Sequence, residues 1–460
     1  MFSFARAAAT AIVAVLATPQ TGRATPAWLR DAVQTATAIR ADTGVRARSL
    51  DSAFAVATFD SAWRTVGSGL EGRGVTRLDW GAVGRELRPR AARAASDSAL
   101  RIVIGEMLSR IGESHFAVIS GRGTATAPDA PADESSLGTA GLALRFLDRR
   151  LVIWRVDSGG PARAAGVVPG WIVEQIDDLV VPALGVADTL PLQRLPVLTD
   201  AMRALRGAPG MPVRVIARDA DGVRHDVTFQ RAAIRGPLAR FGNLPPLPTS
   251  FEATRRTLAD GRCIAIIHFE YWLPPVMPAL DRAVDANRGC AGMVLDLRGN
   301  LGGVAAMMMG VSGHFLNEPS TLGTMRTRGE EMRFVANPRR STSAGLTVVP
   351  FAGPLAIIVD GLSASTSEMF GAAFQALGRA RVFGERTAGQ ALPAMATRLP
   401  NGDVLMHVVA DFVAADGSQI EGKGVIPDEL LPLTPADLAR GRDAPLEAAV
   451  RWISTRRTAP

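Results

Sequence analysis

The sequence has few of the residue types that most often act in catalysis, bind metals or form cross-links. Its 460 residues include two cysteines, one tyrosine and five histidines, and Lys423 is its only lysine. Two cysteines are too few for a scaffold built on disulfides. No pair of histidines stands at a ligand-type spacing with carboxylates. We therefore expect neither a metal nor a cofactor.

The basic residues are scattered. The net charge is +7, yet the arginines form no run or stripe and no aromatic residues are interleaved with them. Nucleic-acid-binding proteins usually cluster their basic residues, so we expect no nucleic-acid partner. With 47% hydrophobic and 21% charged residues, the composition is that of a globular protein. The length predicts two or three domains.

Residues 1–24 have the layout of a secretory signal peptide. A single positive charge precedes a short run of small and apolar residues from Ala7 to Ala17, and Gly22-Arg23-Ala24 offers a cleavage pattern. The run is too short to span a bilayer. An alanine-rich first helix is the alternative. We expect an exported protein, periplasmic or secreted, without stable membrane insertion once the signal is removed.

Each cysteine stands at the head of an apolar, strand-like run. Cys263 precedes Ile264–Phe269, and Cys290 precedes Met293–Leu297. If the two strands are parallel neighbours, the sulfurs could meet at one sheet edge and form a disulfide. Two buried free thiols are the alternative.

Hydrophobic patterning divides the rest of the chain into three parts. Residues 26–120 are predicted to be helical, since the apolar residues between Leu100 and Ile111 follow the spacing of one buried helix face. Residues 137–232 contain short strand candidates. Residues 249–450 alternate strands with helices, which predicts a mixed α/β layer with largely parallel strands.

One candidate for chemistry is Ser365. The apolar strand Leu355–Val359 leads through a turn to this serine, and a helix is predicted to begin near Thr366. Unpaired backbone N–H groups and the helix dipole favour an oxyanion at such a position. Ser365 and Glu368 also fit a helix-capping box, so this segment alone leaves a purely structural role open.

A second candidate is the glycine-rich turn that follows Met293–Leu297. Glycines let the backbone approach a ligand closely, and the N–H of Gly302 or Gly303 could complete an oxyanion hole with that of Thr366. A phosphate-binding loop is the competing interpretation. The turn lacks the Gly-Lys-Ser/Thr ending of that motif.

The C-terminal part contains four short motifs in a fixed order. They are Asp296-Leu-Arg-Gly-Asn-Leu-Gly-Gly303, Ser363-Ala-Ser365-Thr-Ser-Glu368, Gly384-Glu385-Arg-Thr387-Ala-Gly389 and Glu421-Gly-Lys-Gly-Val425-Ile-Pro427-Asp428. Together they resemble the core of the tail-specific, or C-terminal processing, protease family of serine peptidases, in which the motifs have the same order. The resemblance covers nearly the whole chain after residue 24. It implies a ClpP/crotonase-like layered α/β core at 249–450, an N-terminal helical subdomain at 26–120, and polypeptide substrates.

The strand-rich part resembles a PDZ domain. The segment from Gly159 to Asp177 is similar to the characteristic PDZ pattern of small residues and glycines. The resemblance implies an inserted PDZ-like β domain at 137–232, in which Gly141, Leu142, Ala143 and Leu144 form the loop that holds a peptide C-terminus. Alanine stands where a second glycine is common. A small β domain without a ligand is the alternative.

The family has two ways of activating its serine. In the Ser/Lys style a lysine stands at the position of Gln390, whose neutral amide cannot accept the serine proton. The tricorn-like style uses a Ser-His pair from the helical part and a glutamate late in the core, which Ser114, His115 and Glu421 match. The resemblance therefore implies Ser365 as nucleophile, His115 as base, and Ser114 with Glu421 orienting the imidazole.

Alternatives remain open at this stage. His314 is a distant second candidate for the base, whereas His225, His268 and His407 are expected to be structural. A Ser/Lys enzyme that recruits Lys423 from another loop is a third interpretation. Retinoid-binding relatives use the same fold without proteolysis, so a non-catalytic ligand- or peptide-binding protein is the alternative from another functional class.

Overall fold

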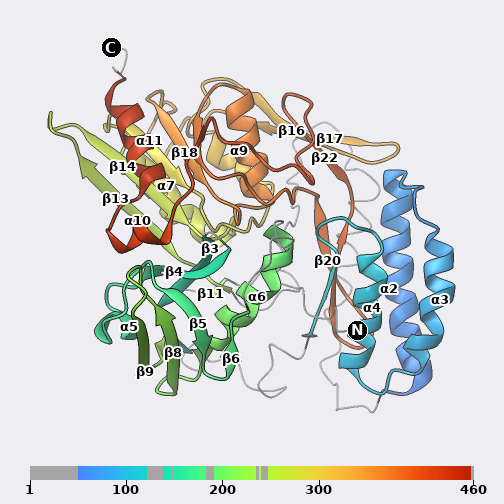
Figure 1. The fold of residues 1–460 in the computed structure, drawn as a ribbon. Helices are drawn as coiled ribbons and strands as arrows, with labels where there is room; N and C mark the ends of the chain where they lie inside the picture. The colour runs from blue at the N-terminus through green and yellow to red at the C-terminus, as the bar shows by residue number, and fades with distance from the viewer. Residues whose placement is uncertain are drawn as a thin grey trace.

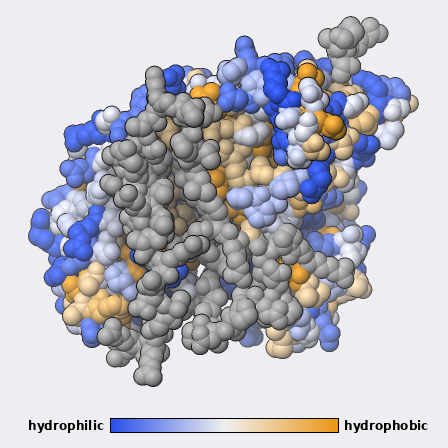
Figure 2. Space-filling model, turned by 180° about the vertical axis from the view of Figure 1, so that it is seen from behind, coloured by the Kyte–Doolittle hydropathy of each residue, from blue (hydrophilic) through white to orange (hydrophobic). Residues whose placement is uncertain are grey.

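The computed structural model describes residues 50–121, 138–147, 149–182, 191–234, 238–239 and 247–456 (Figure 1). The signal-like residues 1–24 lie outside these ranges. None of the described helices combines the length and the apolar character needed to cross a bilayer. On the described part of the face in Figure 2, hydrophobic residues lie in groups among hydrophilic ones.

The first three described helices pack against one another: α2 (Ser52–Arg73), α3 (Trp80–Ala92) and α4 (Asp97–Ser109) (Figure 1). Side chains of Asp51, Asp79 and Ser96 accept backbone N–H groups at their N-termini. The predicted apolar face of α4 is buried in their shared core.

A short strand joins this helical part to the rest of the molecule. β1 (Ala117–Ile119) pairs with β21 (Val404–Val408), which also pairs with β20 (Ala394–Arg398). β1 begins two residues after His115, so this pairing holds the histidine against the C-terminal part of the chain.

The β-rich part is a twisted antiparallel sheet with the strand order β3-β4-β5-β8-β9. Its strands are β3 (Leu142–Leu147), β4 (Arg150–Val156), β5 (Ile172–Ile176), β8 (Pro212–Arg218) and β9 (Arg224–Gln230), with β6 (Leu179–Val180) beside β5. The smaller elements are α5 (Pro161–Ala164), α6 (Pro191–Ala204), β2 (Gly138–Thr139), β7 (Arg206–Gly207) and β10 (Ala232–Ala233). β3 forms one edge of the sheet, and α6 packs against it.

The sheet of the C-terminal part has the order β13-β14-β15-β18-β19-β23 and is parallel except for the β13–β14 pair. Its strands are β13 (Phe251–Thr257), β14 (Cys263–Phe269), β15 (Gly292–Asp296), β18 (Leu355–Val359), β19 (Arg381–Gly384) and β23 (Glu429–Leu430). The central strands β15 and β18 are buried throughout, as parallel strands covered on both faces must be.

Helices cover both faces of this sheet. One apolar cluster includes side chains of α7 (Met277–Ala286), α8 (Met307–Ser312) and α9 (Thr366–Ala376), and another includes side chains of α11 (Ala444–Ser454). A second sheet has the order β17-β16-β22, with β16 (Ser320–Arg326), β17 (Glu331–Ala336) and β22 (Asp411–Ala414). The remaining elements are β11 (Leu238–Ala239), β12 (Leu247–Pro248), η3 (Pro274–Val276) and α10 (Pro435–Ala439). The predicted mixed α/β class is confirmed.

The two cysteines form a disulfide between Cys263 and Cys290, with 4.8 Å between their Cα atoms. β14 and β15 are parallel neighbours, and Ile264 pairs with Gly292 near their first residues. The cysteines therefore meet at the sheet edge where both strands begin, which settles the alternative left open by the sequence.

Candidate active site

Ser365 stands at the first turn of α9, immediately before Thr366. Its backbone has φ 57° and ψ −117°, a left-handed conformation that is rare for a residue with a side chain. The side chain is fully buried and its Oγ has no hydrogen-bond partner. A buried, unpaired hydroxyl on a strained backbone costs free energy, and such strain gathers at functional sites.

Glu368 holds that strained turn in place. Its buried carboxylate accepts the N–H of Ser365 at 3.1 Å, that of Gly389 at 2.7 Å and that of Gln390 at 2.8 Å. Thr387 Oγ1 donates to it at 2.5 Å. Burial raises the pKa of Glu368 to about 7, against the lowering effect of these donors. The capping residue expected from sequence thus joins the serine to the loop at 387–390.

The glycine-rich turn lies directly against the serine. A Cβ on Gly302 would come within 2.7 Å of Ser365 Cβ and 2.9 Å of the Ala364 carbonyl oxygen, and Gly302 has φ +97°. Only glycine permits this approach of the two backbones. The fold therefore brings the glycine-rich turn and Ser365, the candidate nucleophile, together.

The backbone N–H groups predicted to bind an oxyanion differ in their hydrogen-bond acceptors. The Gly302 N–H donates to Asn300 Oδ1 at 2.9 Å. Among the described residues no acceptor is found for the N–H of Gly303 or of Thr366. Thr366 is the first residue of α9, where backbone N–H groups have no intrahelical acceptor. Two of the three groups are thus available for an oxyanion.

Ser114, His115 and Glu421 form one hydrogen-bonded group. Ser114 Oγ lies 2.6 Å from His115 Nδ1 and donates to Glu421 Oε2 at 3.0 Å, and the Ser114 N–H donates to Glu421 Oε1 at 3.0 Å. His115 is buried and has φ 62°. The segments that carry these residues are separated by about 300 positions, and the fold brings them together.

This arrangement fixes the tautomer of the imidazole. Because the Ser114 hydroxyl gives its proton to Glu421, its oxygen accepts a hydrogen bond from His115 Nδ1–H. The lone pair is then on Nε2, which is buried and has no partner. Burial lowers the pKa of His115 to about 3, so the ring is neutral at neutral pH. A neutral imidazole with a free Nε2 can accept a proton.

A continuous path of hydrogen bonds joins the two groups. The Ser365 N–H donates to the Gln390 carbonyl at 2.8 Å, and the next N–H, that of Ala391, donates to Glu421 Oε2 at 2.9 Å. Burial raises the pKa of Glu421. Ser365 Oγ and His115 Nε2 make no hydrogen bond with each other in this conformation. Such contacts are often long without substrate and tighten when it binds.

The remaining histidines have other partners. His225 contacts Asp219, and His268 contacts the Asp296 carbonyl. His314 Nε2 lies 2.8 Å from Asp281, and His407 Nε2 lies 3.0 Å from Thr397 Oγ1. None of these contacts involves the group around Ser365.

Gln390 stands where a Ser/Lys enzyme has its lysine, and its backbone carbonyl contacts Ser365. The Gln390 carbonyl accepts the Ser365 N–H at 2.8 Å, as described above. Lys423 is exposed, in the turn that follows Glu421. Neither residue presents an amine to the serine hydroxyl.

The predicted peptide loop lies at the start of β3. Gly141 has φ +69°, its N–H donates to Thr139 Oγ1 at 3.1 Å, and its carbonyl accepts the Asp157 N–H at 3.0 Å. Leu142 to Leu144 belong to the edge strand itself. Within the described residues β3 has a strand partner on one side only.

Sequence reasoning missed Asp360, which joins the two turns of the site. Asp360 Oδ1 accepts the N–H of Gly299 at 2.9 Å and that of Ser363 at 3.1 Å. A signal was present, because an aspartate at the carboxyl end of a buried strand, followed by Gly361, is a common turn-forming pair. Its reach to Gly299, sixty-one residues away, could not be read from the pattern.

Comparisons with known proteins agree with this architecture. Residues 263–431 match the profile described as Peptidase family S41. The chain is 27% identical over 415 residues to "Putative tricorn protease homolog 2" of Streptomyces coelicolor, covering 85% of this chain and 32% of that protein. It is 25% identical over 303 residues to the carboxyl-terminal-processing protease of Synechocystis, covering 65% of this chain and 63% of that one.

A solved structure shares the fold. The photosystem II D1 C-terminal processing protease superposes with a TM-score of 0.55 at 20% identity, covering 87% of this chain and 97% of that one. The chain spans less than two thirds of the length of the first three curated relatives it matches. Residues 263–431 thus resemble peptidase family S41, as do the relatives matched, and the solved structure shows that the fold is shared.

Proposed function

We propose that the chain is a serine endopeptidase that cleaves polypeptides through an acyl-enzyme on Ser365. The observation that carries the proposal is the presence of two buried atoms without partners, Ser365 Oγ and His115 Nε2, on residues that one hydrogen-bonded path connects through the Ser365 N–H. Leaving both unpaired is costly for folding, and a reaction that needs them accounts for the cost.

The proposed reaction is acyl transfer. Ser365 Oγ attacks the peptide carbonyl while His115 Nε2 takes its proton, and the imidazolium returns that proton to the leaving amine. Water then hydrolyses the ester by the reverse use of the same groups. The Ser114 oxygen and Glu421 stabilise the imidazolium through Nδ1–H. The N–H groups of Thr366 and Gly303, with Gly302 if it leaves Asn300, hold the oxyanion.

The β-rich part is proposed to be a PDZ-like domain that binds the C-terminus of a polypeptide substrate. Support comes from the one-sided pairing of β3 and from α6 packed beside it, the geometry in which an extended peptide adds as a strand. Unfolded or C-terminally exposed polypeptides are the proposed substrates. Export, to the periplasm or the medium, is proposed from the signal-like residues 1–24.

A serine-directed fluorophosphonate probe tests the catalytic proposal. We expect the wild type to label at Ser365, and S365A and H115A to lose labelling and casein turnover, with rates lower by about 10⁴-fold or more. K423M is the matched control and should label like the wild type.

Three outcomes contradict specific parts of the proposal. An unlabelled, well-folded wild type would favour the non-catalytic binding protein. Full labelling of H115A together with loss in K423M would favour the Ser/Lys alternative. Labelling at a serine other than Ser365 would move the nucleophile.

A further inference from the structure

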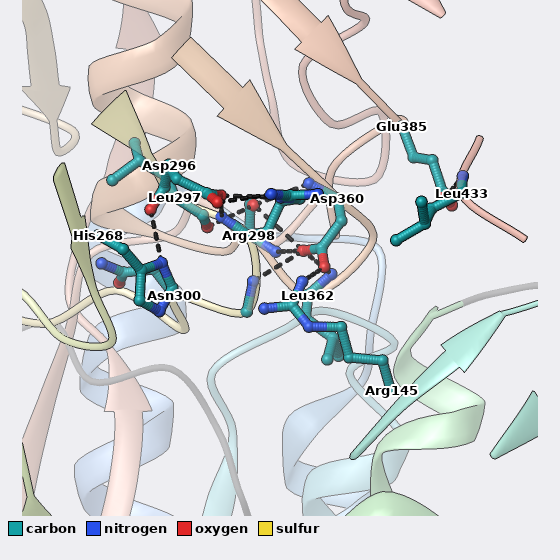
Figure 3. Close-up of polar contacts among 12 residues, drawn as sticks. Arg145, His268, Asp296, Leu297, Arg298, Asn300, Asp360, Leu362, Glu385 and Leu433 are labelled. Atoms are coloured by element: carbon teal, nitrogen blue, oxygen red, sulfur yellow. Dashed lines mark hydrogen bonds and ion pairs between the residues drawn. The ribbon is translucent and has the colours of Figure 1, made fainter. Parts of the chain in front are cut away.

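One arginine of the β-rich part contacts the aspartate that joins the two turns of the candidate site. Arg145 is on β3, and its side chain is only 7% exposed. Its guanidinium forms an ion pair with the Asp360 carboxylate (Figure 3). It also lies over the Trp154 ring, with 3.7 Å between Cζ and the ring centroid. Burial and the nearby Arg298 lower the pKa of Arg145 to about 9, which leaves it charged at neutral pH.

Asp360 is the residue through which this contact reaches the site. It follows β18, and its Oδ1 accepts N–H groups from both turns: Gly299 at 2.9 Å, and Leu362 and Ser363 at 3.1 Å each. The first turn carries Gly303 and the second carries Thr366. The Asp360 carboxylate is therefore one of the contacts that join the two proposed halves of the oxyanion hole. The hydrogen bond from Thr366 Oγ1 to the Gly303 carbonyl at 3.1 Å is another.

Neighbouring charges leave Arg145 as the counter-ion of this carboxylate. Arg298 is occupied by Asp296 at 2.6 Å and by Asp443 at 2.7 Å. Among the described residues, Arg145 is the only cation that forms an ion pair with Asp360. The Arg145 guanidinium packs closely against Gly299, because a Cβ added at Gly299 would clash with it. Removing one partner of such a buried pair leaves the other charge uncompensated.

We propose that Arg145 is a positioning residue, which locks Asp360 and thereby holds the nucleophile turn and the glycine-rich turn at their working distance. Docking of the β-rich part on the core would then be required for an assembled oxyanion site. This inference rests on the proposed peptidase function, and it assigns to the β-rich part a role separate from peptide binding.

The test compares R145M, R145K and D360N with R155M. Arg155 lies on the neighbouring strand β4 and also crosses to the core, pairing with Glu270 at 3.3 Å, but it makes no ion pair with Asp360. We expect R145M and D360N to lower the fluorophosphonate labelling rate and kcat by about 10- to 100-fold, since small misplacements of reacting groups have effects of this size. KM should change by less than about 2-fold, R145K should recover part of the rate, and R155M should match the wild type.

Amide hydrogen exchange gives a readout that does not depend on activity. In R145M the amides of Gly299, Leu362 and Ser363 should exchange faster, while those of β15 should not. Unchanged exchange and labelling in R145M would overturn the inference, as would an equal loss in R155M. If R145M does not fold, D360N decides in the same way. A wild type that is not labelled would contradict only the peptidase proposal. The hydrogen-exchange comparison would still test whether Arg145 holds Asp360 in place.

Discussion

His115 is proposed to act as a base in its neutral form, so its pKa determines how activity depends on pH. Burial lowers its pKa from 6.5 to about 3. Below its pKa the ring is protonated and cannot accept the Ser365 proton, so activity should be lost only as the pH falls toward that low value. We expect the labelling rate of folded protein to stay flat from about pH 8 to about pH 5. A rate that halves near pH 6.5 would show that Nε2 titrates as if exposed.

The same shift affects stability. The unfolded chain binds a proton at His115 below 6.5, whereas the folded chain does not until far lower pH. The contribution of His115 to the free energy of unfolding is therefore complete above pH 6.5. It is lost as the pH falls from 6.5 to about 3. Glu368 has the opposite pH dependence, because burial raises its pKa to about 7. Its contribution to the free energy of unfolding is complete below pH 4.5 and is lost as the pH rises through 7.

Gly302 offers a test of the approach between the two turns. In G302A the new Cβ would lie 2.7 Å from Ser365 Cβ, on a backbone with φ +97°. We expect the fluorophosphonate labelling rate to fall about 100-fold and the free energy of unfolding to drop by about 1–3 kcal/mol. G310A is the control, since a Cβ there meets nothing within 4 Å. Equal labelling of both variants would show that the turns need not be this close.

Single residues of the site differ in how far sequence predicts them. Ser365 was predicted from a strand-to-helix turn, whereas His115 and Glu421 were predicted from motifs that resemble the tricorn-like style of the family. Asp360 and Arg145 were not, because their roles depend on contacts with residues tens or hundreds of positions away. Ser114 and Glu421 could be paired only through family resemblance, since no local pattern joins residues 307 positions apart.

At the scale of elements, the apolar runs predicted the buried parallel strands, whereas β1 (Ala117–Ile119), inside the segment predicted to be helical, was missed. The strand predicted at Leu355–Val359 has those bounds, and the one predicted at Ile264–Phe269 begins one residue earlier, at Cys263. Buried parallel strands are continuous apolar runs, which is why they were recognised. The sheet order was not predicted, because apolar runs do not specify their neighbours.

The disulfide joins the first residue of β14 to Cys290, which lies two residues before β15. It closes a loop with a sequence separation of 27 between β14 and β15, and a loop of this size gives about 3 kcal/mol of stabilisation. We expect the C263S/C290S variant to lose about that much free energy of unfolding in urea. Wild type in dithiothreitol should approach the same value. A variant as stable as the oxidised wild type would mean that the sheet alone holds these strands.

At the scale of the whole molecule, the proposed base and nucleophile belong to different parts, and Arg73 is one of the ties between them. Its side chain, 4% exposed at the end of α2, binds Glu113 at 2.7 Å and Asp411 of β22 at 2.6 Å. Glu113 directly precedes Ser114. The ion pairs therefore connect the helical part, the segment that carries the base, and the core.

We expect R73M to slow fluorophosphonate labelling by about 10-fold or more, because the Ser114–His115 segment loses its anchor to β22. The free energy of unfolding should fall by about 1–3 kcal/mol, less than for a fully buried pair, since Asp411 is 39% exposed. R88M is the matched control: Arg88 pairs with Asp60 inside the helical part and is 55% exposed. If R73M loses stability but labels like the wild type, the helical part would stabilise the molecule without positioning its base, and β1 pairing with β21 would be the remaining anchor of His115.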